Sequence, residues 1–293
     1  MRQQVLFVGN GLNRTARGNS SWYSLLETLA GAPTTDEERS VLEAKPFTLW
    51  FEELACRSDG SKKLQEIIAD KLFELSPTPL HNHLMRLGFQ TILTTNYDHC
   101  LESASGAIWH DQNTAPETTY SLFRRRTSAE QSIWHLHGDF THTKSILLGH
   151  GQYIGYMEKI RSYLTYKVGK EGKPSSSSHR KSKFSGAPID GKYIESWVDN
   201  FLESDVFMLG FSLDYSENHL WHLITEKYRN RQGNPASGGM TFYRCSTGTQ
   251  TAAEKAKLSL LNSFGVITRD IVRPSYGEAY QACLEELELL TTQ

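Results

Sequence analysis

The sequence is poor in cysteine and has no long apolar run. Its four cysteines lie far apart and form no C-x-x-C pair: Cys56, Cys100, Cys245 and Cys283. This spacing argues against a cysteine zinc site and favours a reducing compartment, so we expect a cytoplasmic protein without zinc. No stretch approaches the roughly 20 apolar residues that a membrane helix needs. The first apolar segment begins at Val5, and we therefore expect no signal peptide ahead of it.

A strong charge of either sign is also missing. The 31 Lys and Arg residues nearly balance the 33 Asp and Glu residues, which leaves a formal net charge of −2. This balance gives no electrostatic argument for direct binding to nucleic acid or to an anionic membrane. The composition, 38% hydrophobic and 22% charged, fits a globular protein, and we expect a single domain over residues 1–293.

Apolar runs typical of buried strands recur along the chain, with helical patterns between them. We predict strands at residues 5–9, 89–95, 132–137, 145–149, 205–211, 240–244 and 265–270. Several of these runs are continuously apolar rather than alternating, which indicates strands that are covered on both faces. Alternating strands and helices predict an α/β fold with a doubly wound, mostly parallel, Rossmann-like sheet.

Two segments, residues 32–88 and 150–203, interrupt this alternation. The first contains successive helical patterns without a strand, and the second contains two helical patterns around a stretch rich in Ser, Gly and Lys. We expect helical insertions that form a cap over one edge of the sheet. We also expect the stretch at residues 165–190 to be mobile, because it offers almost nothing to bury.

Polar residues follow four of the predicted strands directly. They form the groups Gly9-Asn10-Gly11, Thr94-Thr95-Asn96-Tyr97-Asp98, His137-Gly138-Asp139 and Gly210-Phe211-Ser212-Leu213-Asp214. Ligands of open α/β sheets bind beyond the carboxyl ends of the strands, so we expect these groups to share one site. The first group begins like a dinucleotide-binding loop, but Arg14 occupies the position of the third glycine in G-x-G-x-x-G.

The tract around His137 also permits a metal-binding interpretation. His135, His137 and Asp139 begin like the H-x-H-x-D-H pattern of binuclear metallohydrolases. Alternation along a strand places the two histidines on the same face, so they could share a metal. The pattern is incomplete, because Phe140 stands where its last histidine is expected and His142 comes two positions later.

Taken together, these motifs resemble the sirtuin-like family, and most closely its bacterial NAD-consuming branch found in antiphage defence. The sequence GNGLN at 9–13 is similar to the family's GAGxS, and NSSWYSLL at 19–26 to the pattern that follows it in this branch. TTNYD at 94–98 matches T-x-N-x-D, HGD at 137–139 matches the H-G block, and GFS at 210–212 matches G-x-S. The blocks occur in the family's order and leave only the helical insertions unmatched.

The resemblance implies a role for each matched residue. Gly9, Asn10 and Gly11 would line the pyrophosphate of NAD with backbone N–H groups, and Asn13 takes the place of the family's serine. Thr95, Asn96 and Asp98 would surround the nicotinamide ribose, with Asn96 orienting water and the carboxamide and Asp98 orienting the ribose or stabilising positive charge. His137 would act as general base. Gly210 and Ser212 would contact the adenosine half, and Asp214 would help hold its ribose.

The resemblance also implies a function. We expect an NAD+ glycohydrolase that releases nicotinamide and ADP-ribose, used as a triggered, NAD-depleting effector of antiphage defence by abortive infection. The four-cysteine zinc module of sirtuin deacylases is missing. We therefore expect NAD+ hydrolysis rather than deacylation. A protein deacylase or ADP-ribosyltransferase on the same scaffold is the first alternative, and a non-catalytic NAD or ADP-ribose sensor is the second.

The trigger of such an effector has to come from elsewhere, because the sequence contains no recognisable sensor domain and no P-loop motif. The resemblance implies a partner protein, either a nucleic-acid-translocating ATPase or an Argonaute-like protein. It also implies a homo-oligomer. The resting enzyme needs restraint, which oligomerisation or the 165–190 stretch would provide.

Overall fold

The computed structural model describes residues 2–15, 26–27, 29–31, 33–57, 60–165, 194–233 and 237–291. Its centre is an eight-stranded sheet with the order β3-β4-β5-β2-β1-β6-β7-β8. The strands are β1 (Gln4–Val8), β2 (Thr91–Thr94), β3 (His110–Asn113), β4 (Arg124–Thr127), β5 (Ser132–His135), β6 (Asp205–Leu209), β7 (Met240–Ser246) and β8 (Val266–Val272). Strands β5, β2, β1, β6, β7 and β8 run parallel, whereas β3 and β4 form an antiparallel edge. The predicted doubly wound, mostly parallel sheet is confirmed.

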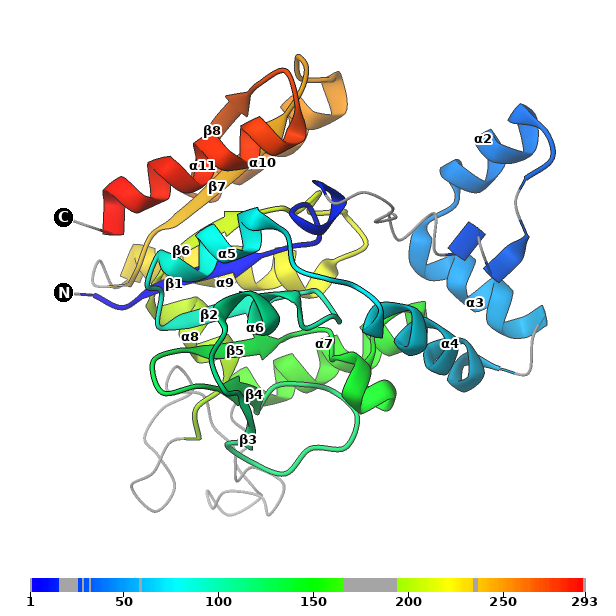
Figure 1. The fold of residues 1–293 in the computed structure, drawn as a ribbon, viewed down its shortest axis with the longest axis horizontal. Coiled ribbons are helices and arrows are strands. Elements are labelled where there is room, and N and C mark those ends of the chain that lie inside the picture. The colour runs from blue at the N-terminus through cyan, green and yellow to red at the C-terminus, as the bar shows by residue number, and fades with distance from the viewer. Residues whose placement is uncertain are drawn as a thin grey trace.

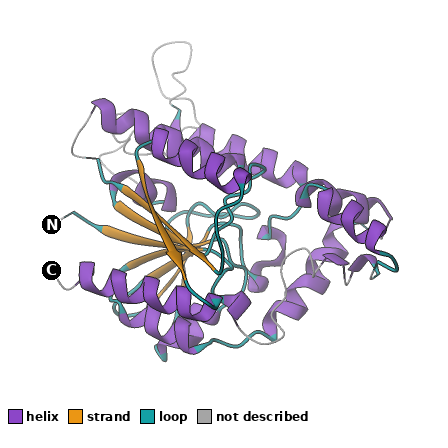
Figure 2. Cartoon of the chain, turned by 90° about the horizontal axis from the view of Figure 1, so that it is seen from above, coloured by secondary structure: helices purple, strands orange, loops and turns teal. Residues whose placement is uncertain are grey.

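Helices cover both faces of the sheet (Figure 2). Val5 and Phe7 pack on one face, against α7 (His150–Leu164), α8 (Trp197–Glu203), α9 (Asn218–Gly233) and α10 (Ala252–Ser263). Leu6 and Val8 pack on the other face, against α5 (Pro79–Arg86), α6 (Cys100–Ser105) and α11 (Tyr276–Thr291). Burial on both faces explains why β1 is continuously apolar. Among the described residues, no helix has the length and apolar character of a membrane span.

The first insertion forms a helical projection beside the strand ends (Figure 1). It comprises α2 (Asp36–Ala44), α3 (Phe47–Arg57) and α4 (Ser61–Phe73). Apolar side chains of α3 and α4 form a third core cluster with Tyr97, Ile146 and Leu148, which lie in loops at the same edge. Helices α2, α3 and α4 therefore pack beside the loops that carry the polar groups. The expected cap is limited to them, because α5, within residues 32–88, and α7 and α8, within residues 150–203, pack on the faces of the sheet.

The predicted strand at residues 145–149 is wrong. These residues follow the short 3-10 helix η2 (Phe140–Ser145) as a buried connection without a strand partner. Side chains satisfy its backbone instead: Gln65 Nε2 donates to the Ile146 carbonyl at 2.7 Å, and Gln152 Oε1 accepts from the Leu148 amide at 2.8 Å. An apolar run of this length can be buried as a loop when such partners are available.

Two expectations fall partly or wholly outside the described residues. The pattern at 19–26 lies there except for Leu26, and the 165–190 stretch lies there except for Thr165. Leu26–Glu27 and Leu29–Ala30 are helical, and the following Gly31 has a φ of +88°. A glycine with positive φ is a usual end of a helix.

Candidate active site

A cavity of about 460 Å³ lies beyond the carboxyl ends of β1, β2, β5, β6 and β7. Seven of the predicted site residues line it: Asn10, Gly11, Thr95, His137, Gly210, Ser212 and Asp214. The volume falls within the range of about 300–1,000 Å³ that is typical of small-molecule sites. The cavity also has walls that lie outside the sequence motifs, from helices α7, α10 and α11 and from the start of α9.

The glycine loop after β1 is joined tightly to the turn after β6. Gly9 N–H donates to the Leu209 carbonyl and Gly11 N–H donates to the Gly210 carbonyl, both at 2.9 Å. Gly210 has a φ of +79°, a conformation that favours glycine. The expectation that Gly9 and Gly11 offer their N–H groups to a pyrophosphate is therefore not met in this structure. Both donors hold the two loops together, and Gly9 does not line the cavity.

Replacing Gly9 with alanine should destabilise the fold. A Cβ atom there would lie 2.5 Å from the Gly210 carbonyl oxygen, which is backbone and cannot rotate away. We expect the free energy of unfolding to fall by about 1–3 kcal/mol, the usual effect of overpacking. Urea denaturation measures this change. Gly248→Ala is the matched control, because a Cβ there meets nothing within 4 Å, and equal stability of both variants would contradict the prediction.

Asn13 and Asp98 are buried together behind the cavity wall. Asn13 Nδ2 donates to Asp98 Oδ2, and Asn13 Oδ1 contacts His81 Nε2, both at 2.7 Å. Asp98 Oδ1 accepts from the Cys100 N–H at 3.0 Å, at the start of α6. The expected contacts of Asp98 with a ribose and of Asn13 with the nucleotide are thus replaced by contacts within the protein. Both residues connect the glycine loop to β2 and α6.

Asn96 lies between two residues that line the cavity, Thr95 and Tyr97. Its backbone is fixed on both sides, since its N–H donates to Thr94 Oγ1 at 3.0 Å and its carbonyl accepts from His135 Nδ1 at 2.7 Å. Its side-chain oxygen Oδ1 is buried and has no hydrogen-bond partner among the residues that the structure describes. A buried acceptor without a partner is rare enough to require an explanation, such as a bound water or ligand.

His137 contacts a second histidine that the motifs do not include. Its Nε2 lies 2.8 Å from Nε2 of His219, at the start of α9, and both side chains are buried. One of the two Nε2 atoms must carry a proton and donate it, and the other must accept it. The two imidazoles therefore share a single proton between these atoms. Burial lowers the pKa of His137 to about 3, and burial together with His137 lowers the pKa of His219 well below its usual value. Both imidazoles are therefore neutral near pH 7.

His135 belongs to a separate charge network behind Asn96. Its Nε2 lies 2.9 Å from Glu102 Oε1. Although burial lowers the pKa of His135, the Glu102 carboxylate raises it to about 9, so the imidazole is protonated and donates from both nitrogens. Arg126 completes the network, with its Nη1 2.5 Å from His99 Nδ1 and 3.8 Å from Glu102 Oε1.

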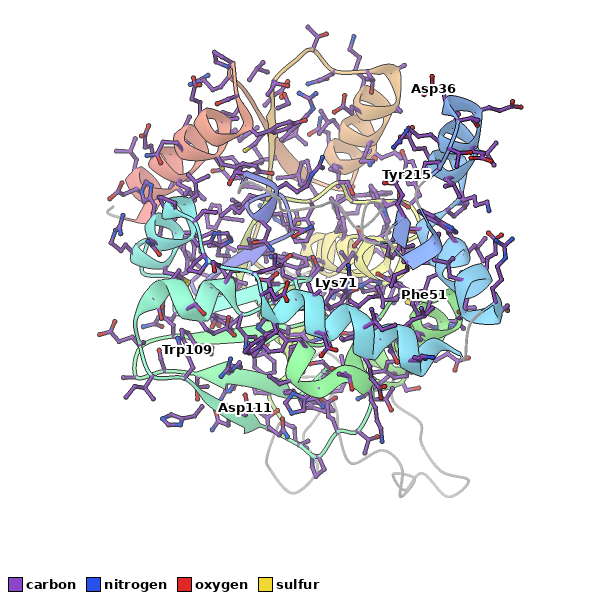
Figure 3. All side chains as sticks on the ribbon, turned by 45° about the vertical axis from the view of Figure 1, so that its right-hand side comes forward. Asp36, Phe51, Lys71, Trp109, Asp111 and Tyr215 are labelled. Carbon is purple, nitrogen blue, oxygen red and sulfur yellow. The ribbon has the colours of Figure 1, made fainter. Side chains whose placement is uncertain are left out.

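The alternative interpretation of His135, His137 and Asp139 as a shared metal site is not supported, because the two histidines face different partners. Within the described residues, the group with the spacing of metal ligands is His99, Glu102 and His135. The Arg126 guanidinium contacts His99 and Glu102 of this group. His99, Glu102 and Arg126 of this network also line a second cavity, together with Trp109. Figure 3 shows Trp109 and Tyr215, which are labelled there, on opposite sides of the view.

The motif analysis missed several residues of the cavity wall: Arg14, Tyr153, Glu217, Lys257 and Tyr280. Tyr153 lies on α7 and Glu217 directly precedes α9, and neither belongs to a polar group at a predicted strand end. For Glu217 the available signal was its position in the sequence, because residues 214–219 come soon after the G-x-S block that follows β6. The substitution of Arg14 for a glycine also marked that residue as unusual.

Comparisons with known proteins agree with this geometry. Residues 90–266 match the SIR2-like domain family, a segment that carries the strand-end groups after β2, β5 and β6. The chain is also similar to the NAD(+) hydrolase ThsA of Bacillus cereus (strain MSX-D12), with 26% identity over 168 residues. This alignment covers 55% of the chain and 33% of ThsA, so the chain spans about a third of that relative. Since the family match covers more than half of its residues, the chain belongs to the SIR2-like domain family.

Proposed function

We propose that the protein is an NAD+ glycohydrolase, which cleaves the nicotinamide–ribose bond and releases nicotinamide and ADP-ribose. The observation that carries this proposal is the neutral imidazole of His137 on the cavity wall, together with the unsatisfied amide oxygen of Asn96, which lies between the cavity-lining residues Thr95 and Tyr97. Membership of the SIR2-like family and similarity to an NAD(+) hydrolase support it.

Cleavage of this bond develops positive charge at the anomeric carbon, as glycoside hydrolysis does. The enzyme must position a water molecule against that carbon. The free Oδ1 of Asn96 is suited to accept a hydrogen bond from this water or from a ribose hydroxyl. Because burial lowers the pKa of His137 to about 3, its neutral imidazole is better suited to accept a hydrogen bond from a ribose hydroxyl, and so to orient it, than to act as the expected general base.

The other end of the cavity would hold the diphosphate and adenosine. Since the Gly9 and Gly11 amides are used within the protein, Arg14 is the better candidate to neutralise the diphosphate. It lines the cavity at the position of the missing third glycine. Gly210, Ser212 and Asp214 would contact the adenosine half, as the family resemblance implies. Asp98 and Asn13 would act indirectly, by fixing the loops that carry these residues.

Incubation of the purified protein with NAD+ tests the proposal, with nicotinamide and ADP-ribose quantified by chromatography and binding measured by calorimetry. Stoichiometric release of both products is expected. NAD+ binding without release, both by the protein alone and after addition of a lysate from phage-infected cells, would contradict the hydrolase and favour the sensor function. Turnover that depends on an acyl-lysine peptide, or transfer of ADP-ribose to protein, would favour the deacylase or transferase. Absence of binding would contradict all three.

We further propose that NAD+ loss is triggered during phage infection through a partner protein or a change in oligomeric state. The support is the family resemblance together with a chemical requirement, since unrestrained NAD+ hydrolysis would kill its own cell. Cellular NAD+ measured before and after phage infection, in cells expressing wild-type protein or Asn96→Ala, tests this role. Depletion only in infected wild-type cells is expected, and constant NAD+ after infection would contradict it.

A further inference from the structure

We propose that Glu217 is a further catalytic residue, whose carboxylate faces the reacting sugar carbon and accepts the proton of the attacking water. This inference rests on the proposed hydrolase function and adds a carboxylate to the Asn96 and His137 pair. Glu217 lines the cavity from the segment that connects β6 to α9. None of the sequence motifs includes it.

The turn before α9 fixes the Glu217 side chain. Its Oε2 accepts from the Asp214 N–H at 3.1 Å, and its own N–H donates to the Asp214 carbonyl at 3.0 Å. Its second oxygen, Oε1, has no hydrogen-bond partner in the part of the chain that the structure describes. One oxygen therefore holds the side chain in place, and the other is available to a ligand.

The other carboxylates that line the cavity, Asp214 and Glu254, are less suited to this role. Glu254 is paired with Arg244 at 2.9 Å and accepts from Thr251 at the start of α10. Asp214 is exposed, and its Oδ1 accepts from the Ser216 N–H at 2.8 Å. Glu217 is thus the carboxylate of the wall that is both partly buried and free of a cationic hydrogen-bond partner.

The surroundings of Glu217 place it at the same end of the cavity as His137. Its charge contributes to the raised pKa values of Tyr97 and Tyr153, after burial as the main cause. These two rings flank His137, with centroids 6.4 and 5.5 Å from the imidazole centroid. Two residues after Glu217, His219 contacts His137 directly. One short segment therefore supplies a carboxylate and the partner of the imidazole.

The Glu217 side chain changes its protonation state near neutral pH. Burial raises its pKa to about 7, and the Asp214 carboxylate adds to this effect. The Asp214 N–H and the Lys257 ammonium on α10 act in the opposite direction. The remaining groups that face it, Tyr97 and Tyr153, are neutral at this pH because their pKa values are raised. Glu217 therefore changes from acid to carboxylate within the range in which an enzyme works.

The proposed step is balanced. The bond between the anomeric carbon and the nicotinamide nitrogen breaks, and its electron pair neutralises the pyridinium. A water oxygen forms the new bond to the anomeric carbon, and one water proton passes to the Glu217 carboxylate and then to solvent. NAD+ and water thus give nicotinamide, ADP-ribose and one proton. The carboxylate also stabilises the positive charge that develops on the sugar.

Glu217→Gln tests the proposal, because the amide oxygen can still accept from the Asp214 N–H. We expect kcat to fall by about 10²-fold or more, as for loss of a general base. NAD+ affinity measured by calorimetry should stay within about threefold of wild type. Glu226→Gln, on the solvent side of α9 and paired with Arg229, is the matched control and should keep wild-type kcat. Formate should restore part of the activity of Glu217→Ala.

The pH profile separates a catalytic from a structural role. Since the carboxylate is the active form, wild-type kcat should fall about tenfold per unit as the pH drops below about 7. His137 cannot produce this limb, because its pKa is lowered to about 3. The limb should vanish in Glu217→Gln. A variant with wild-type kcat and an unchanged profile would overturn the role of Glu217 and leave the hydrolase intact, whereas an inactive wild type would overturn the hydrolase itself.

Discussion

Asn96→Ala should lower kcat for NAD+ cleavage by about 10²–10⁴-fold, the range for loss of a positioned polar catalytic group. The physical reason is the side-chain oxygen of Asn96, which is buried without a partner in the described part of the chain and which we propose orients the attacking water. The fold should be unaffected, because no described residue depends on that oxygen and the backbone contacts of Asn96 remain. Product release at saturating NAD+ measures the effect, and thermal unfolding verifies the fold.

Asn82→Ala, at an exposed position on α5, is the control for this experiment and should retain wild-type kcat. His137→Ala should show a loss of similar size, since it removes the imidazole from the same end of the cavity. Cleavage by Asn96→Ala at the wild-type rate would refute the assignment of Asn96.

Glu102→Gln should be the most damaging of these substitutions for stability. It removes the buried carboxylate that pairs with His135 at 2.9 Å and with Arg126 at 3.8 Å. Breaking a buried ion pair by removing one partner lowers the free energy of unfolding by about 3–5 kcal/mol. Urea denaturation at pH 7 measures this loss. Glu130→Gln, at an exposed position, should change stability little, and a similar midpoint for both variants would refute the prediction.

The same ion pair predicts a pH dependence. The pKa of His135 is raised from 6.5 to about 9 in the folded protein. Its stabilising contribution is therefore fully present below pH 6.5 and is lost as the pH rises through about 9. This amounts to about 3 kcal/mol, because one pKa unit corresponds to about 1.4 kcal/mol. The stability difference between wild type and Glu102→Gln should shrink over this interval, and a constant difference would contradict the assigned charges.

Sequence patterns predicted the sheet well where strands are buried on both faces, as at Val5–Val8. They missed β3 and β4, because His110–Asn113 and Arg124–Thr127 contain no apolar residue and belong to the edge of the sheet. They also assigned a strand to residues 145–149, where side chains replace the strand partners. Local apolarity reports burial, but it does not report which groups satisfy the backbone.

The candidate site was predictable to the extent that strand ends must converge. Asn10, Thr95 and His137 do meet at one cavity. The partners of each residue were not predictable, because they come from distant elements. The pairing of Asn13 with Asp98, and of His137 with His219, joins positions more than 80 residues apart. Helical spacing at α9 explained its leucines fully and left no signal for the polar residues at its start.

The shared proton between His137 and His219 has a consequence for charge selection. Two protonated imidazoles would repel a substrate whose nicotinamide ring is itself a cation. Because the low pKa values keep both rings uncharged, this wall adds no positive potential to the proposed binding site of the pyridinium. Once the ring has left as neutral nicotinamide, its attraction to nearby carboxylates disappears. Under the proposed function, the site would therefore favour the charged reactant and hold the departing product less strongly.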